Sequence, residues 1–176
     1  MRDHLAWGRS VSEDFRLLVF QIAEALGIQP DWLMACMAFE TGATFSPAIR
    51  NAAGSGAVGL IQFMPQTAAA LGTTIEALAA MGPCQQLIYV ERYFLPRAGK
   101  LRNLGDVYMA ILWPAGIGRP DDAVLFDRDD PAHPKLYLQN RGLDFNRDGK
   151  ITRGECVARV QSYLDRGLSP EHCWRP

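Results

Sequence analysis

Hydrophobic and polar positions recur with the period of an α-helix over most of the chain. The clearest stretch is 13–26, whose apolar residues share one helical face: Phe15, Leu18, Val19, Ile22 and Leu26. Ser10 and Glu13 have the spacing of a capping box, and Gly27 is a typical stop. The pattern therefore predicts a first helix that ends at Gly27.

The same pattern predicts a mainly α-helical protein. Further helices are expected over these segments: 30–40, 60–71, 74–81, 84–95 and 104–112. Residues 42–57 are rich in small and polar residues, which predicts a long loop, either irregular or containing a small hairpin. The proline-containing stretch 113–134 is expected to be irregular, and the tail from 135 is predicted to be a helix–loop–helix.

Length and composition fit one globular domain with a small extension. The chain has 176 residues, 48% of them hydrophobic and 21% charged, and a formal net charge of −1. We expect a domain over 1–116, and a proline-rich connector with an extension over 117–176 that packs on the same domain. The balanced charge argues against nucleic acid as a partner, and the lack of a long apolar run argues against membrane insertion. We expect a monomer.

A single carboxylate, Glu40, closes the second predicted helix, directly before Thr41 and Gly42. Carbonyls at a helix C-terminus carry partial negative charge, which repels an ionised carboxylate. Apolar neighbours such as Met37 and Phe39 reduce its hydration, and both effects raise the pKa of an acid. An acid that keeps its proton near neutral pH is suited to glycosidic bond cleavage. The alternative is a solvated surface residue.

The segment 54–72, GSGAVGLIQFMPQTAAALG, places small residues ahead of a helix, where backbone can approach a ligand closely. Within it, Gln62 stands between the apolar Ile61 and Phe63. A glutamine in such a setting needs a buried hydrogen-bonding partner or a ligand amide. Gln62 is therefore a candidate binding residue alongside Glu40.

Two motifs, E-T-G-x-x-F-S-P at 40–47 and G-A-V-G-L-I-Q-F-M-P-Q-T-A at 56–68, stand in that order in the chain. Together they resemble the soluble lytic transglycosylases and goose-type lysozymes, and most closely the phage endolysin and virion-associated members. The resemblance implies a lysozyme-like helical fold over roughly 12–116. It also implies a substrate, the β-1,4 bond between N-acetylmuramic acid and N-acetylglucosamine in the glycan strands of bacterial peptidoglycan.

The resemblance assigns roles to individual residues. It makes Glu40 the catalytic acid and base, and Gln62, with Phe63 beside it, a substrate-binding residue that touches an N-acetyl group. Thr41 stands where the family has a serine that contacts the glutamate or the substrate. No cofactor is implied for the chemistry.

The third motif of the family, A-Y-N-x-G, is less well kept. Its best match begins at Ala110, and Leu112 and Trp113 replace the tyrosine and asparagine. Either Tyr108, one helical turn earlier, or Trp113, as a platform on which a sugar stacks, is a candidate substitute for the missing tyrosine. The alternative is that both are core residues.

Glycosidases usually pair an acid with a second carboxylate. Candidates for a second group are Glu76, Glu91 and Asp106, but the loop after Glu40 holds none. A single acid matches the lytic transglycosylases, in which the 6-hydroxyl of muramic acid attacks the anomeric carbon and a 1,6-anhydro sugar results. We expect this reaction; the alternatives are a hydrolytic muramidase and a non-catalytic calcium-binding module that recognises peptidoglycan.

The tail carries DFNRDGKITRGE at 144–155, which has the spacing of a twelve-residue EF-hand loop. Its predicted oxygen ligands occupy loop positions 1, 3, 5, 7, 9 and 12: Asp144, Asn146, Asp148, Lys150 through its carbonyl, Thr152 and Glu155. We expect one structural Ca²⁺ that pins the proline-rich segment and the last helix against the main domain. The alternative is a polar turn that has lost its metal.

The cysteine pattern and the N-terminal sequence indicate in which cellular compartment the protein is made and acts. The four cysteines, Cys36, Cys84, Cys156 and Cys173, form no CxxC pair, which argues against a zinc site. Cys156 and Cys173 either pair under oxidising conditions or remain reduced thiols. The N-terminal sequence has no apolar stretch of signal-peptide length. We therefore expect synthesis in the cytoplasm and action on periplasmic or cell-wall peptidoglycan after release or injection.

Overall fold

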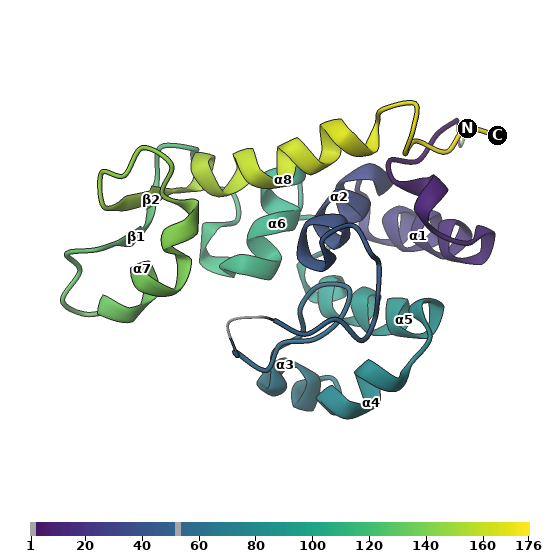
Figure 1. Ribbon diagram of the computed structural model, residues 1–176, viewed down its shortest axis with the longest axis horizontal. Coiled ribbons are helices and arrows are strands. Elements are labelled where there is room, and N and C mark those ends of the chain that lie inside the picture. The colour runs from purple at the N-terminus through teal and green to yellow at the C-terminus, as the bar shows by residue number, and fades with distance from the viewer. Residues whose placement is uncertain (1–2, 52–53) are drawn as a thin grey trace.

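The computed structural model describes residues 3–51 and 54–176. This part of the chain is mainly helical, with 54% of residues in helices and a small two-stranded sheet, which confirms the predicted fold class. The central helices lie beneath one long C-terminal helix, and the two ends of the chain lie side by side (Figure 1). An isolated bridge between Leu5 and Trp174 holds these ends together.

The first two helices begin and end where local chemistry dictates. Helix α1 spans Glu13–Leu26, and the Ser12 side chain caps it by accepting a hydrogen bond from the backbone N–H of Phe15. The predicted capping box at Ser10 is therefore wrong by two residues, since Ser10 lies in a short 3₁₀ turn, Gly8–Ser10. Helix α2 spans Pro30–Thr41 and is buried along most of its length, so it forms the centre of the core.

Three helices follow α2 along the chain: α3, Pro65–Ala70; α4, Ile75–Ala80; and α5, Pro83–Phe94. The two short ones, α3 and α4, form the lowest part of the molecule in Figure 1. Helix α3 is shorter than predicted, because Val58 and Phe63 pair through two backbone hydrogen bonds and hold the preceding residues in a tight turn. The predicted loop over 42–57 has isolated bridges in place of a hairpin, and its residues 52–53 lie outside the described residues.

A buried glutamine, Gln86 on α5, fixes the loop that precedes α3. Its Oε1 accepts a hydrogen bond from the Leu60 N–H at 2.7 Å, and its Nε2 donates to the carbonyls of Pro47 and Leu78. A side chain at Gly59 would overlap this amide, so only glycine permits the approach. Gln86 therefore holds the loop in place at Pro47 and Leu60, close to Gln62.

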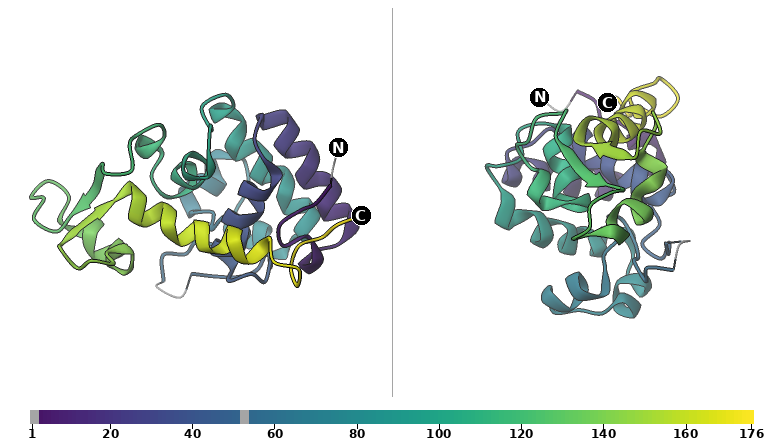
Figure 2. Two further views of the ribbon diagram at one scale, coloured as in Figure 1. Left: turned by 90° about the horizontal axis from the view of Figure 1, so that it is seen from above. Right: turned by 90° about the vertical axis from the view of Figure 1, so that its left-hand side faces the viewer.

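The C-terminal third packs directly on the central helices. Helix α6, Leu104–Leu112, and the long α8, Arg153–Gly167, both lie against α2. Figure 1 and the left view of Figure 2 show α8 running from the extension towards the ends of the chain. Helix α7, Pro134–Asn140, lies in the extension and is followed by a loop and then by α8. The predicted helix–loop–helix tail is therefore present.

Neither strand of the small sheet was predicted. Residues 113–134 contain β1, Val124–Asp127, which pairs antiparallel with β2, Lys150–Thr152. The strand forms because Phe126 is buried opposite Ile151, a partner that is distant in sequence. Short-range periodicity carries no information about such pairing.

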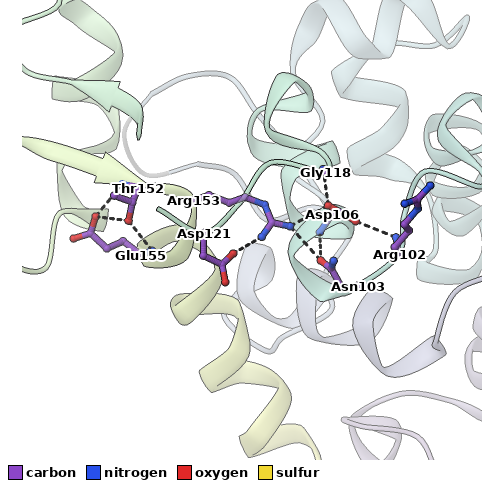
Figure 3. Close-up of polar contacts among 8 residues, drawn as sticks. All are labelled: Arg102, Asn103, Asp106, Gly118, Asp121, Thr152, Arg153 and Glu155. Atoms are coloured by element: carbon purple, nitrogen blue, oxygen red, sulfur yellow. Dashed lines mark hydrogen bonds and ion pairs between the residues drawn. The ribbon is translucent and has the colours of Figure 1, made fainter. Parts of the chain in front are cut away.

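A buried ion-pair network joins the extension to α6 (Figure 3). Arg153 donates from Nη2 to Asp106 Oδ1 at 2.9 Å and from Nη1 to Asp121, while its side chain is only 6% exposed. The guanidinium lies directly over Gly105, where a Cβ would clash with it. Asp106 also accepts backbone N–H groups from Arg102 and Gly118. The network therefore fixes the start of α8 relative to α6.

Two further expectations can be compared with the structure. All four cysteines are free, so Cys156 and Cys173 are reduced thiols. Within residues 3–51 and 54–176, the helices are too short or too polar to cross a membrane.

Candidate active site

A pocket of about 530 Å³ lies where the C-terminus of α2 meets α6 and the loop before α3. One wall of the pocket comes from these three segments and consists of Phe39, Glu40, Ile49, Arg50, Asn51, Gln62, Tyr108 and Leu112. A different hollow, of about 470 Å³, lies beside His4, Glu24 and Asp31 and contains none of the predicted residues. The pocket at Glu40 is therefore the candidate active site.

Glu40 lies in the last turn of α2, half-buried at the wall of the pocket. Among the described residues, none forms a hydrogen bond or an ion pair with its carboxyl group. Burial raises the pKa of Glu40 from its ordinary 4.5 to about 8. The side chain therefore keeps its proton at neutral pH, as the sequence predicted.

Gln62 lines the same pocket from the loop before α3. Its backbone has a positive φ of 52°, which is unusual for a residue with a side chain and is imposed by the tight turn. Its Nε2 donates to the carbonyl oxygens of Gly59 at 3.1 Å and Ile49 at 3.3 Å. With both amide hydrogens used, the atom left for a ligand is Oε1, an acceptor.

Tyr108 reaches the pocket from α6, although it is only 2% exposed overall. Its ring packs edge-on against Phe39, with ring centroids 5.4 Å apart. Burial, and the nearby Glu40, raise the pKa of Tyr108 well above its usual value. The phenol is therefore a hydrogen-bond donor at every physiological pH.

The other predicted sugar contacts lie outside this lining. Thr41 is fully buried, and its hydroxyl donates to the Met37 carbonyl at 2.7 Å and accepts from the Phe45 N–H at 3.0 Å. Phe63 is 2% exposed and packs against a tyrosine of α5 behind Gln62. Trp113 packs edge-on against Phe126, 5.4 Å between ring centroids. The structure thus brings Gln62 and Tyr108 to Glu40, and places these three elsewhere.

The candidates for a second carboxylate also lie elsewhere. Asp106 is 1% exposed and paired with Arg153, and Glu76 lies exposed beside a different hollow near α4. Glu91 is half-buried on α5, outside the pocket. Among the described residues that line the pocket, Glu40 is the only acid.

Comparison with known protein families gives one match. The transglycosylase SLT domain matches residues 18–112, more than half of the chain. The chain belongs to this family. The matched range contains α2, Gln62 and α6, and so contains all three residues that meet at the acid. A comparison with curated proteins finds no match.

Family membership fixes the general activity. Members of the SLT family are peptidoglycan lytic transglycosylases, so the chain is an enzyme of this kind, with peptidoglycan as its substrate. Its mainly helical architecture agrees with the lysozyme-like fold of the family. The residues assigned from the two motifs lie within the SLT match.

The pocket has a second wall that lies outside the SLT match. It comes from α7, the following turn and α8, through Gln139, Asn140, Gly142, Leu143 and Arg159. Sequence reasoning missed these residues, because no motif marks them and only the folding of the extension over α2 brings them close. Ile49 and Asn51 were missed as well, since the loop that carries them has no pattern of its own.

The loop at 144–155 is tied together by its own polar groups. Asp144 Oδ2 accepts hydrogen bonds from Tyr137 Oη at 2.6 Å and from the Gly149 N–H at 3.0 Å. Its Oδ1 is buried without a partner. Asn146 and Asp148 bond to each other. The loop is therefore a turn closed by its own hydrogen bonds, with one unsatisfied carboxylate oxygen.

Two of the predicted ligands, Thr152 and Glu155, cap the N-terminus of α8. Glu155 Oε2 accepts hydrogen bonds from both the N–H and the hydroxyl of Thr152, each at 2.9 Å, and the pair forms a capping box at the start of α8. Lys150 lies in β2. Across the described residues, no group of three or more His, Cys, Asp and Glu side chains converges as a metal-binding set.

Proposed function

We propose that the enzyme cleaves the β-1,4 bond between N-acetylmuramic acid and N-acetylglucosamine with Glu40 as its single acid and base, and releases a 1,6-anhydromuramyl product. The observation that carries this proposal is a neutral carboxylic acid that has no second carboxylate beside it in the pocket. A hydrolase that uses two carboxylates needs the second group near the scissile bond. In the proposed reaction the 6-hydroxyl of the substrate's own muramic acid takes the place of that second group.

The reaction then has two proton transfers through one side chain. Protonated Glu40 gives its proton to the glycosidic oxygen as the bond to the anomeric carbon breaks. The resulting carboxylate takes the proton of the muramic acid 6-hydroxyl as this oxygen bonds to the anomeric carbon. Glu40 is thereby protonated again, and no water is consumed. A pKa of about 8 suits both steps, since the side chain is protonated before the first transfer and is a competent base after it.

Two neighbours of Glu40 orient the sugar in this proposal. The free Oε1 of Gln62 accepts a hydrogen bond from an N-acetyl N–H, because its Nε2 is already bound to backbone. The Tyr108 phenol donates to the substrate and replaces the tyrosine missing from the third motif. Thr41 acts indirectly, because its hydroxyl ties the loop at Phe45 to the end of α2.

The mass of the soluble products tests the reaction type. Purified sacculi incubated with the enzyme should release muropeptides whose reducing-end muramic acid is the anhydro form, lighter by one water than the hydrolysed sugar. Mass spectrometry distinguishes the two. A water-containing product would favour the muramidase alternative, and binding without release would favour a recognition module.

We propose that the loop at 144–155 binds one structural Ca²⁺. Its donors would be the side chains of Asp144, Asn146, Asp148, Thr152 and Glu155 and the carbonyl of Lys150, all oxygen ligands suited to a hard cation. The buried, unpartnered Oδ1 of Asp144 supports this. Because Glu155 now caps α8, binding exchanges part of that cap for an ion contact.

Removal of calcium should lower the melting temperature. A ligand present at about 100 times its Kd stabilises a protein by about 2.7 kcal/mol, which corresponds to a shift of roughly 5–10 °C for a chain of this size. Differential scanning fluorimetry in excess Ca²⁺ and in excess chelator measures this shift. The variant Asp144→Ala should melt at the same temperature in both; identical melting of the wild type in both would contradict a bound ion.

We propose that the enzyme acts outside the cytoplasm in which it is made, because peptidoglycan lies beyond the cytoplasmic membrane. The resemblance to phage endolysins supports delivery by host lysis or by injection from a virion. We propose a monomer, since the pocket is built entirely within one chain.

A further inference from the structure

We propose that the pocket also binds the peptide stem of the muramic acid, through ion pairs between stem carboxylates and two arginines, Arg159 on α8 and Arg50 on the facing loop. This inference rests on the proposed function, and it names the part of the substrate that the extension recognises. The stem is joined by an amide to the lactyl group of muramic acid and carries free carboxylates. It is therefore the anionic part of an otherwise neutral glycan strand.

The charges of the pocket favour an anion. Its lining holds two guanidinium groups and one acid, and that acid keeps its proton at neutral pH. Among the described residues, neither Arg50 nor Arg159 forms an ion pair with a carboxylate. The pocket therefore carries a net positive charge in an otherwise slightly acidic protein. An anionic ligand is attracted more strongly in such a partly enclosed site than on an open surface, because water screens the charges less.

Arg159 is held in place before a ligand arrives. Its Nη2 donates to the Gly142 carbonyl at 3.2 Å, and its guanidinium carbon lies 4.5 Å from the centre of the Phe145 ring. These two contacts leave most of its five N–H donors available. A stacked, preoriented guanidinium is suited to bidentate binding of a carboxylate.

The neighbours of Arg159 fit a peptide better than a bare sugar. Gln139 and Asn140 on α7 line the same wall, and the amide of Asn140 is tethered to the Leu136 carbonyl at 2.9 Å. Side-chain amides both donate and accept, which matches the N–H and C=O groups of a peptide backbone. Glu40 lines the same pocket, so a stem that reached Arg159 would still leave its muramic acid near the catalytic acid.

Binding of defined muropeptides to the inactive Glu40→Gln protein tests the inference. The probes are N-acetylglucosaminyl-N-acetylmuramic acid with its tetrapeptide stem and the same disaccharide with its lactyl carboxyl capped as a methylamide, which carries no charge, measured by calorimetry at low ionic strength. The stem should tighten binding about tenfold or more, as expected for charge-assisted hydrogen bonds. Adding Arg159→Gln should remove this advantage, and Arg159→Lys should restore part of it.

The exposed Arg119, which does not line the pocket, supplies a charge-matched control. Arg119→Gln in the same Glu40→Gln background should keep the preference for the stem. Equal Kd values for the two probes, or a preference that survives Arg159→Gln, would overturn the inference. Either result leaves the cleavage reaction untouched, because release of anhydro products by the wild type is measured separately.

Discussion

Glu40→Gln is expected to lower the release of soluble muropeptides from sacculi by at least about a thousandfold. Proton transfer by a positioned side chain contributes about 10²–10⁴ in rate, and here one residue supplies both transfers. The amide has almost the shape of the protonated acid, so it should occupy the same place beside Gln62 and Tyr108. Initial rates from released reducing or anhydro ends measure the loss.

The same substitution should stabilise the protein. The folded pKa of Glu40 is raised to about 8 from 4.5, so between these pH values the unfolded chain ionises while the folded chain keeps its proton. The free energy of unfolding of the wild type therefore falls as pH rises through this window. Glutamine does not titrate, and the variant should be more stable by about 3 kcal/mol at pH 7. The difference should vanish below pH 4.5.

Urea melts at several pH values measure this difference, and Glu91→Gln is a matched control. Glu91 lies on α5 outside the pocket, so its replacement should leave the cleavage rate unchanged. Retained cleavage by Glu40→Gln would reject the assignment of the acid. Lower stability of that variant at pH 8 would reject its burial as a neutral group.

Asp106→Ala should have the largest effect on folding. The substitution removes the buried partner of the Arg153 guanidinium and leaves it only the exposed Asp121 as an ion pair, and it removes the acceptor of the Gly118 and Arg102 N–H groups. Breaking a buried ion pair in this way costs about 3–5 kcal/mol. Thermal unfolding should show a melting temperature lower by roughly 6–20 °C.

Two further variants show whether the buried charge causes the loss. The double variant Asp106→Leu/Arg153→Met removes both charges and should be more stable than Asp106→Ala, because no unpaired ion remains. Asp129→Ala breaks only the exposed pair with Arg128 and should change stability by less than about 1 kcal/mol. If Asp106→Ala were as mild as Asp129→Ala, the network would not hold the extension in place.

Local signals in the sequence predicted the helices and the acid. Helical periodicity and stop residues set α1, α2 and α6 to within a few residues, because these helices bury an apolar face. Glu40 stood out because it is an acid at a helix end among apolar residues, a setting that predicts a raised pKa. Gln62 was found through its apolar neighbours in the sequence.

The rest of the site depends on contacts between distant segments. Strand β1 requires β2, more than twenty residues later, and the pocket wall at Arg159 requires α8 to cross α2. Trp113 was expected as one possible sugar platform, but its ring packs edge-on against Phe126 of β1, and Trp113 does not line the pocket. The role of Thr41 could not be predicted either. Its hydroxyl forms hydrogen bonds with backbone groups of Met37 and Phe45, and the hydrophobic pattern of the sequence does not reveal such contacts.

The proposed reaction depends on Glu40 being protonated at neutral pH, and carbon-13 NMR of the side-chain carboxyl groups measures this protonation directly. Glutamate labelled at the carboxyl carbon, compared in wild type and Glu40→Gln, identifies the resonance that the substitution removes. That resonance should titrate with a midpoint near 8. A midpoint near the ordinary 4.5 would mean that the acid is ionised at neutral pH and would contradict the proposed chemistry.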